Sequence, residues 1–162
     1  MTFEPTATRL WKRLAREDRL AAATCFWREP PPEIAGGALA AIVKARRMRP
    51  QAARALSDDA RSQALAGILD PGETLAAALL VALHLGERRP LLKAFLDALG
   101  LPHEEGILKE EADALPPPSG DALKTAVISL SGFGRNQVEA YLNTIWLQDP
   151  GRWAALEAVS VD

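Results

Sequence analysis

Apolar residues recur along most of this chain at the spacing of amphipathic α-helices. The clearest stripe falls at positions i, i+3, i+4 and i+7 and consists of Leu92, Phe95, Leu96 and Leu99. A second stripe consists of Val138, Tyr141, Leu142, Ile145 and Trp146. This spacing predicts helices that bury one face. Residues 73–85 are apolar nearly all round, so we expect that helix at the centre of the molecule.

Prolines, glycines and capping residues divide the chain into helical segments. Pro50 and Pro90 suit the first position of a helix, Ser57 and Asp149 suit a cap, and Gly86 and Gly100 suit left-handed endings. We expect helices over about residues 6–27 (with a break near Asp18), 33–46, 50–56, 57–69, 73–86, 90–100, 103–115, 121–131, 135–148 and 150–159. The segment 103–115 is acidic and contains Gly106, so its helical signal is the weakest.

A faint echo links two parts of the chain 46 positions apart. Arg89–Leu101 reads RPLLKAFLDALGL, Arg135–Leu147 reads RNQVEAYLNTIWL, and Gly86 and Gly132 precede the copies at the same offset. A poorer third copy ends at Pro50–Leu56. Such spacings are typical of HEAT and armadillo repeats, in which helical hairpins stack through matching apolar stripes. A short right-handed stack of this kind and an irregular bundle both remain open.

Composition agrees with an all-α fold of about nine short helices in antiparallel hairpins. Alanine and leucine are abundant, whereas the β-branched residues that favour strands are few. We expect residues 1–162 to form a single domain, because 162 residues suffice for one hydrophobic core. Its expected parts are an N-terminal helical segment (1–29), central helices (33–115), a Pro-rich linker (116–120) and C-terminal helices (121–159).

The chain carries no sign of export or membrane insertion. Basic residues interrupt its first thirty positions, and its longest apolar run, residues 75–83, is about half the length that a bilayer requires. The single cysteine, Cys25, cannot form an internal disulfide, which suits a reducing compartment. We therefore expect a soluble cytoplasmic protein without a membrane partner.

Charge is distributed unevenly, although the net charge is only −2. Residues 1–54 carry eleven Lys or Arg and five Asp or Glu, and residues 55–162 carry eight and sixteen. The most conspicuous basic cluster is Lys44, Arg46, Arg47, Arg49 and Arg54. A helix C-terminus attracts such cations, which explains part of the cluster. The functional alternative is contact with an acidic protein surface. Nucleic acid is disfavoured, because the sequence pI is about 5.8 and no aromatic residues interleave with the cations.

No residue pattern identifies a reaction. The two histidines, His84 and His103, and Cys25 do not have the spacing of metal ligands, and no motif marks a catalytic nucleophile. We therefore predict no metal, cofactor or catalytic residue. A weak anion site is predicted where glycines meet a helix N-terminus, at Gly132, Gly134, Arg135 and Asn136, although a tight turn explains these glycines more simply.

The sequence therefore favours a non-enzymatic interaction or scaffold module that binds another protein. The alternative is a regulatory or small-molecule-binding domain with a pocket beside helix 73–85, near Leu79, Leu83 and Phe95. Trp11 and Trp153 lie on the terminal helices, and large aromatic rings often anchor interfaces. A homodimer or partner contact through one of them is a further hypothesis.

Overall fold

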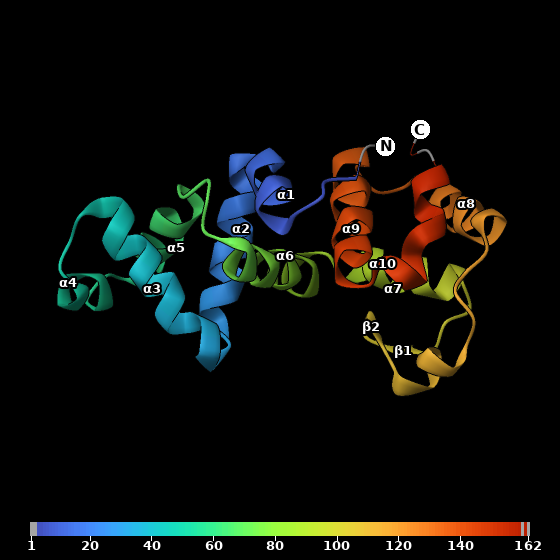
Figure 1. Cartoon of the computed structure of the whole chain (residues 1–162), viewed down its shortest axis with the longest axis horizontal. Coiled ribbons are helices and arrows are strands. Elements are labelled where there is room, and N and C mark those ends of the chain that lie inside the picture. The colour runs from blue at the N-terminus through green and yellow to red at the C-terminus, as the bar shows by residue number, and fades with distance from the viewer. Residues whose placement is uncertain (1–2, 160, 162) are drawn as a thin grey trace. The chain divides into compact units, whose positions relative to one another are not determined.

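The computed structural model describes residues 3–159 and 161, and this part of the chain is mostly helical with very little sheet (Figure 1). The α-helices are α1 (Ala7–Arg13), α2 (Arg16–Arg28), α3 (Pro32–Arg46), α4 (Pro50–Arg54), α5 (Asp58–Ala66), α6 (Glu73–Glu87), α7 (Arg89–Ala98), α8 (Gly120–Ser129), α9 (Arg135–Gln148) and α10 (Pro150–Trp153). Two 3₁₀ helices, η1 (Glu110–Ala114) and η2 (Ala154–Ala158), and two strands, β1 (His103–Glu104) and β2 (Ile107–Leu108), complete the fold. The predicted all-α class is confirmed.

The chain forms two compact units. One, the 6–87 unit, is Thr6–Glu87, and the other, the 88–162 unit, is Arg88–Asp162 together with Met1–Pro5. The division falls between α6 and α7. The segment predicted as a Pro-rich linker, 116–120, lies within the 88–162 unit, between η1 and α8.

In the 6–87 unit, α2 packs against both α5 and α6, and α1 packs against α6. The side chains that α2 buries are Ala22, Ala23 and Phe26. Two of these are small, which lets the neighbouring helices approach closely. Trp11 of α1 is fully buried, and its indole N–H donates to the carbonyl oxygen of Ile68 at 2.8 Å. A buried indole with a satisfied N–H anchors α1 in this core.

Glu73, the first residue of α6, caps the N-terminus of α1. Its carboxylate accepts hydrogen bonds from the backbone N–H of Ala7 (2.6 Å), the backbone N–H of Thr8 (3.1 Å) and the Thr8 hydroxyl (3.1 Å). Burial raises the pKa of Glu73, but these three bonds outweigh it and leave the pKa below its ordinary value. Thr6 caps the same helix by accepting from the Arg9 N–H.

In the 88–162 unit, Phe95 of α7 lies fully buried among aromatic rings. It meets Tyr141 of α9 edge-to-face with centroids 5.5 Å apart, and its centroid is 5.8 Å from that of Trp153. Burial of the Tyr141 side chain raises the pKa of its hydroxyl. Residues near the N-terminus join the unit, because the Glu4 N–H donates to Asn143 at 2.9 Å and the Phe3 ring lies 5.2 Å from that of Trp146.

Several expected helix boundaries are wrong in detail. The first segment breaks at Leu14 and Ala15 rather than near Asp18, and α5 ends at Ala66 rather than Leu69. Gly86 does not end α6 in the left-handed conformation, because it is an ordinary helical residue. A Cβ atom there would clash with Cys25 of α2, so Gly86 permits close helix packing. Gly100 does adopt the left-handed ending, with φ +63°.

The helix expected over residues 103–115 is also wrong. Its first half is the β1–β2 hairpin, in which His103 pairs with Leu108 and Glu104 with Ile107. The two residues between the strands, Glu105 and Gly106, both have positive φ (50° and 85°), as a tight two-residue hairpin turn requires. Helical residues have negative φ, so this turn excludes a continuous helix. Only the second half is helical, as the short 3₁₀ helix η1.

The 46-residue echo does not build two equivalent stacked hairpins. The helices of its first copy, α6 and α7, belong to different units, whereas α8 and α9 share one. Seven of the nine stripe residues are buried, whereas Leu99 and Trp146 are half-buried, and the equivalent residues Phe95 and Tyr141 touch. The echo therefore reflects matching apolar stripes on α7 and α9, and the irregular bundle is the arrangement within each unit.

Candidate functional site

The five basic residues predicted to contact a partner lie at the end of α3, in the following turn and on α4. We call Lys44, Arg46, Arg47, Arg49 and Arg54 the basic surface. Lys44 and Arg46 occupy the last turn of α3, and Arg47 is its C-cap. Arg49 is the N-cap of α4, and Arg54 is the last residue of that helix.

The backbone of this region explains why the cations follow one another so closely around a turn. Arg47 is left-handed, with φ +50°, and the N–H groups of Arg47 and Met48 both donate to the Val43 carbonyl. This is the hydrogen-bonding pattern of a Schellman-type helix ending. Pro50 then starts α4, because its fixed φ suits a first helical position and it needs no N–H partner there.

All five side chains of the basic surface are exposed, and none makes a hydrogen bond or ion pair with another described residue. No acidic residue occurs between Glu33 and Asp58 that could neutralise them locally. Some cations elsewhere do find partners, as in Lys93–Glu105 (3.0 Å) and Arg152–Asp113 (3.6 Å). The basic surface is thus a concentration of uncompensated positive charge.

The helix dipole accounts for only part of this cluster. A cation near a helix C-terminus gains about 0.3–1 kcal/mol, which applies to Lys44 and Arg46 on the last turn of α3. Arg49 lies at the N-terminus of α4, where the same dipole disfavours positive charge. No interaction within the chain therefore explains a cation at position 49.

The predicted anion site at the start of α9 is exposed and partly occupied by the chain itself. Gly132, Gly134, Arg135 and Asn136 are all solvent-exposed, and Gly134 is the N-cap of α9. The Arg135 Nε donates to Glu139 Oε1 at 3.0 Å, so the guanidinium already faces a carboxylate. Arg135 also borders a hollow of about 270 Å³ whose other walls are mainly apolar. Anion binding here stays a prediction.

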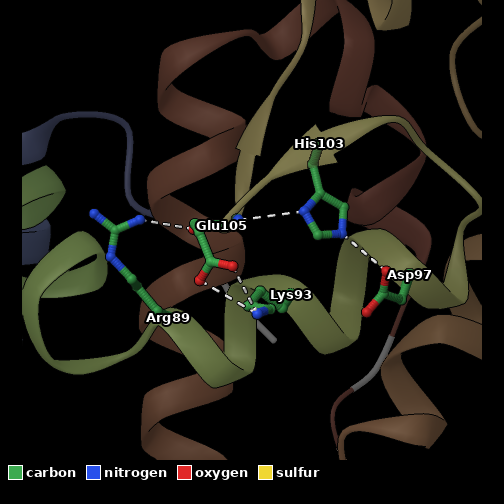
Figure 2. Close-up of polar contacts among 6 residues, drawn as sticks. Arg89, Lys93, Asp97, His103 and Glu105 are labelled. Atoms are coloured by element: carbon green, nitrogen blue, oxygen red, sulfur yellow. Dashed lines mark hydrogen bonds and ion pairs between the residues drawn. The ribbon is translucent and has the colours of Figure 1, made fainter.

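A polar cluster, which the sequence did not indicate, holds the β1–β2 hairpin against α7 (Figure 2). Lys93 pairs with Glu105 at 3.0 Å, Arg89 donates to the Glu105 carbonyl at 2.8 Å, and His103 Nε2 lies 2.9 Å from Asp97 Oδ1. Arg89, Lys93 and Asp97 are spaced four residues apart, so one face of α7 carries all three. We call this cluster the hairpin clasp.

The hairpin clasp is structural in character. The N–H of Gly106 donates to His103 Nδ1 at 3.3 Å, which places the imidazole proton on Nε2, toward Asp97. Both ring nitrogens are thereby engaged within the chain. The Lys93 hydrogen bond and charge lower the pKa of Glu105. A signal for the hairpin did exist, because a two-residue turn ending in glycine between short strands is a known pattern.

Other groups that could carry chemistry are buried or dispersed. His84 of α6 is buried. Burial raises the pKa of the Cys25 thiol, and nearby Glu87 raises it further, so the reactive thiolate is disfavoured. Among the described residues, no three His, Cys, Asp or Glu side chains gather as a metal site.

The residues named for a ligand pocket are packed in the core. Leu79 and Leu83 are buried in the 6–87 unit, and Phe95 is buried in the 88–162 unit. The structure instead has an open hollow of about 620 Å³ beside the hairpin clasp, lined by Arg89, Lys109, Ile107, Leu108 and four glutamates. A pocket beside helix 73–85 remains a prediction.

The tryptophans named for a partner contact are not exposed. Trp11 has no exposed surface and Trp153 retains only 3%. A contact through either ring is therefore wrong for this structure, because partners cannot reach them. Homodimerisation itself stays a prediction.

No family model matches this chain, and neither does any curated protein or solved structure. Within residues 3–159 and 161, no helix combines the length and the apolar character needed to cross a bilayer.

Proposed function

We propose that this chain is a non-enzymatic helical interaction module that binds an acidic segment of another protein through the basic surface. The observation that carries the proposal is the unpaired state of five exposed cations within eleven residues that contain no acidic side chain. An acidic protein segment supplies the missing counter-charge. A cytoplasmic location accompanies the proposal, because the single cysteine forms no internal disulfide.

An acidic peptide fits this surface better than nucleic acid does. The chain as a whole is acidic, with net charge −2, so long-range attraction to an extended polyanion is weak. Aromatic side chains that could stack on bases are also lacking between residues 34 and 57. A short acidic segment needs only the local charge of the basic surface.

The test is binding of a fluorescently labelled oligoglutamate peptide, measured by anisotropy at low salt. The test variant combines Arg46→Ala, Arg47→Ala and Arg49→Ala. The matched control combines Arg9→Ala, Lys12→Ala and Lys109→Ala, which removes the same charge from exposed side chains without partners among the described residues. Both variants are checked for unchanged thermal unfolding.

Three exposed charge contacts of about 0.5 kcal/mol each amount to roughly a tenfold loss of affinity. We expect that loss in the basic-surface variant and less than about a twofold change in the control. Equal losses in both variants would show that only net charge matters. Tighter binding of a single-stranded oligonucleotide than of the peptide would replace the proposed partner with nucleic acid.

A further inference from the structure

His103 contacts two partners that belong to different elements (Figure 2). Its Nε2 lies 2.9 Å from Asp97 Oδ1 of α7, and its Nδ1 accepts the backbone N–H of Gly106 at 3.3 Å. The His103 side chain is only 10% exposed, and these two contacts engage both of its ring nitrogens. The ring therefore joins the turn of the β1–β2 hairpin to α7.

This arrangement requires the neutral form of the His103 ring. A backbone N–H can only donate, so Nδ1 must keep its lone pair and carry no proton. Protonation places a hydrogen on Nδ1, and this hydrogen then faces the N–H of Gly106. Turning the ring does not restore an acceptor, because both nitrogens of an imidazolium are donors. Protonation of His103 therefore breaks its hydrogen bond with Gly106.

The hairpin turn depends on that hydrogen bond. Gly106 lies between the paired residues Glu104 and Ile107, outside the strand ladder, so the ring of His103 supplies the acceptor for its N–H. Gly106 also lies directly on Leu92 of α7, because a Cβ atom added to this glycine would be 2.7 Å from the Leu92 Cβ. Leu92 itself is buried. The turn thus covers part of the apolar stripe of α7, and loosening the turn exposes that stripe.

The charges around the His103 ring determine which of its two contacts survives protonation. On α7, Arg89 donates to the Glu105 carbonyl and Lys93 pairs with the Glu105 carboxylate, so Asp97 is the carboxylate in contact with the ring. A protonated ring keeps Asp97 as an ion-pair partner, because charge-assisted hydrogen bonds are stronger than neutral ones. The other charged side chains beside the hairpin line the neighbouring hollow and are Glu104, Lys109, Glu110 and Glu111. The ring therefore stays on α7 while the turn loses its attachment.

We propose that His103 is a pH-sensitive latch, whose neutral ring fastens the hairpin turn to α7 and whose protonation releases that turn. Histidine is the side chain that ordinarily changes charge between about pH 5 and pH 8. Release of the turn uncovers Leu92. It also reshapes the hollow of about 620 Å³, whose wall includes the hairpin residues Glu104, Glu105, Ile107 and Leu108. The latch is separate from the proposed recognition of an acidic partner.

The test is an NMR titration of the ¹⁵N-labelled protein from about pH 8 to about pH 5. The measured quantity is the protection of the Gly106 amide against hydrogen exchange, relative to an unstructured peptide at the same pH. Loss of one hydrogen bond should lower this protection by about three- to tenfold. The fall should follow the ring titration of His103 and not that of His84, the other histidine of the chain. Carboxyl groups ordinarily titrate near about pH 4, below this range.

Two substitutions separate the titration of the ring from the presence of an acceptor. In His103→Asn, the side-chain Oδ1 takes the place of Nδ1 and accepts the Gly106 N–H, but the amide does not titrate. This variant should protect Gly106 equally at both ends of the pH range. His103→Leu offers no acceptor, so it should leave the Gly106 amide unprotected throughout.

Amides in the cores of α7 and α9, such as those of Phe95 and Tyr141, report whether the 88–162 unit stays folded. Their protection should not change across the titration. Unchanged protection of Gly106 in the wild type would overturn the latch, and so would an equal fall in His103→Asn. Loss of protection throughout α7 and α9 would also overturn it, because the release would then be general unfolding. None of these results depends on the oligoglutamate assay, so the two proposals fail separately.

Discussion

The substitution Gly86→Ala tests how closely α2 and α6 approach each other. Gly86 is helical, so alanine suits its backbone conformation. Its new Cβ would nevertheless lie 2.9 Å from the Cβ of Cys25 and still closer to the sulfur. Real Cβ contacts are longer than this, so α2 or α6 must move. The same substitution at Gly36 of α3 meets nothing within 4 Å.

The two substitutions should therefore act in opposite directions. Overpacking costs about 1–3 kcal/mol, whereas replacing a helical glycine by alanine gains up to about 1 kcal/mol. Gly86→Ala should lower the free energy of unfolding by about 1–2 kcal/mol, and Gly36→Ala should raise it by up to about 1 kcal/mol. For a chain of this size, each kcal/mol shifts the melting temperature by roughly 2–4 °C.

The assay is thermal and denaturant unfolding followed by far-UV circular dichroism. Cys25→Ala removes the sulfur atom, so the double variant with Gly86→Ala should recover part of the lost stability. A Gly86→Ala variant as stable as Gly36→Ala, or a double variant without recovery, would refute the close approach of α2 and α6.

Three further predictions concern stability. Gly106→Ala should destabilise the 88–162 unit by about 2–4 kcal/mol, measured by denaturant unfolding, because φ is +85° and the new Cβ would lie 2.7 Å from that of Leu92. Glu73→Gln should lower stability at pH 7. The pKa of Glu73 in the folded chain is below its ordinary value of 4.5. The extra stability of the wild type over Glu73→Gln should therefore be complete above pH 4.5 and should fade as the pH falls through the folded pKa. A stability difference that persists at pH 2 would contradict this. Trp11→Phe should cost about 1–3 kcal/mol by leaving the Ile68 carbonyl unpaired, and an unchanged melting temperature would argue against that bond.

Most of the helices were predictable because their existence depends on local signals. Ser57 and Asp149 each cap a helix with a side-chain hydrogen bond, as the sequence suggested. Pro50 occupies the first position of α4, and Gly100 ends α7 in the left-handed conformation. These features involve residues within one turn of each other, so the sequence alone contains their cause.

Apart from the β1–β2 hairpin, whose turn signal is local, the features that the sequence missed depend on residues far apart in the chain. Gly86 looked like a helix ending, but its neighbour across the helix pair is Cys25, 61 positions away. Glu73 looked like a residue of its own helix, yet it caps α1. Such roles arise only when packing brings two segments together.

The candidate site was only partly accessible from sequence. The composition of the basic surface was visible as five cations without acids among them. The sequence could not show whether these cations have ion-pair partners, because such partners come from other elements, as Glu105 does for Lys93. The hairpin clasp was missed for the same reason, since its groups lie on α7 and on the β1–β2 hairpin.

The most direct test of the proposed recognition is a titration of the ¹⁵N-labelled protein with the oligoglutamate peptide, followed by two-dimensional NMR. The account predicts that the largest amide shift changes fall in residues 44–54, at the end of α3 and on α4, and that they diminish as salt is added. Largest changes at residues 132–136 or in the hairpin clasp, or no saturable change at all, would contradict it.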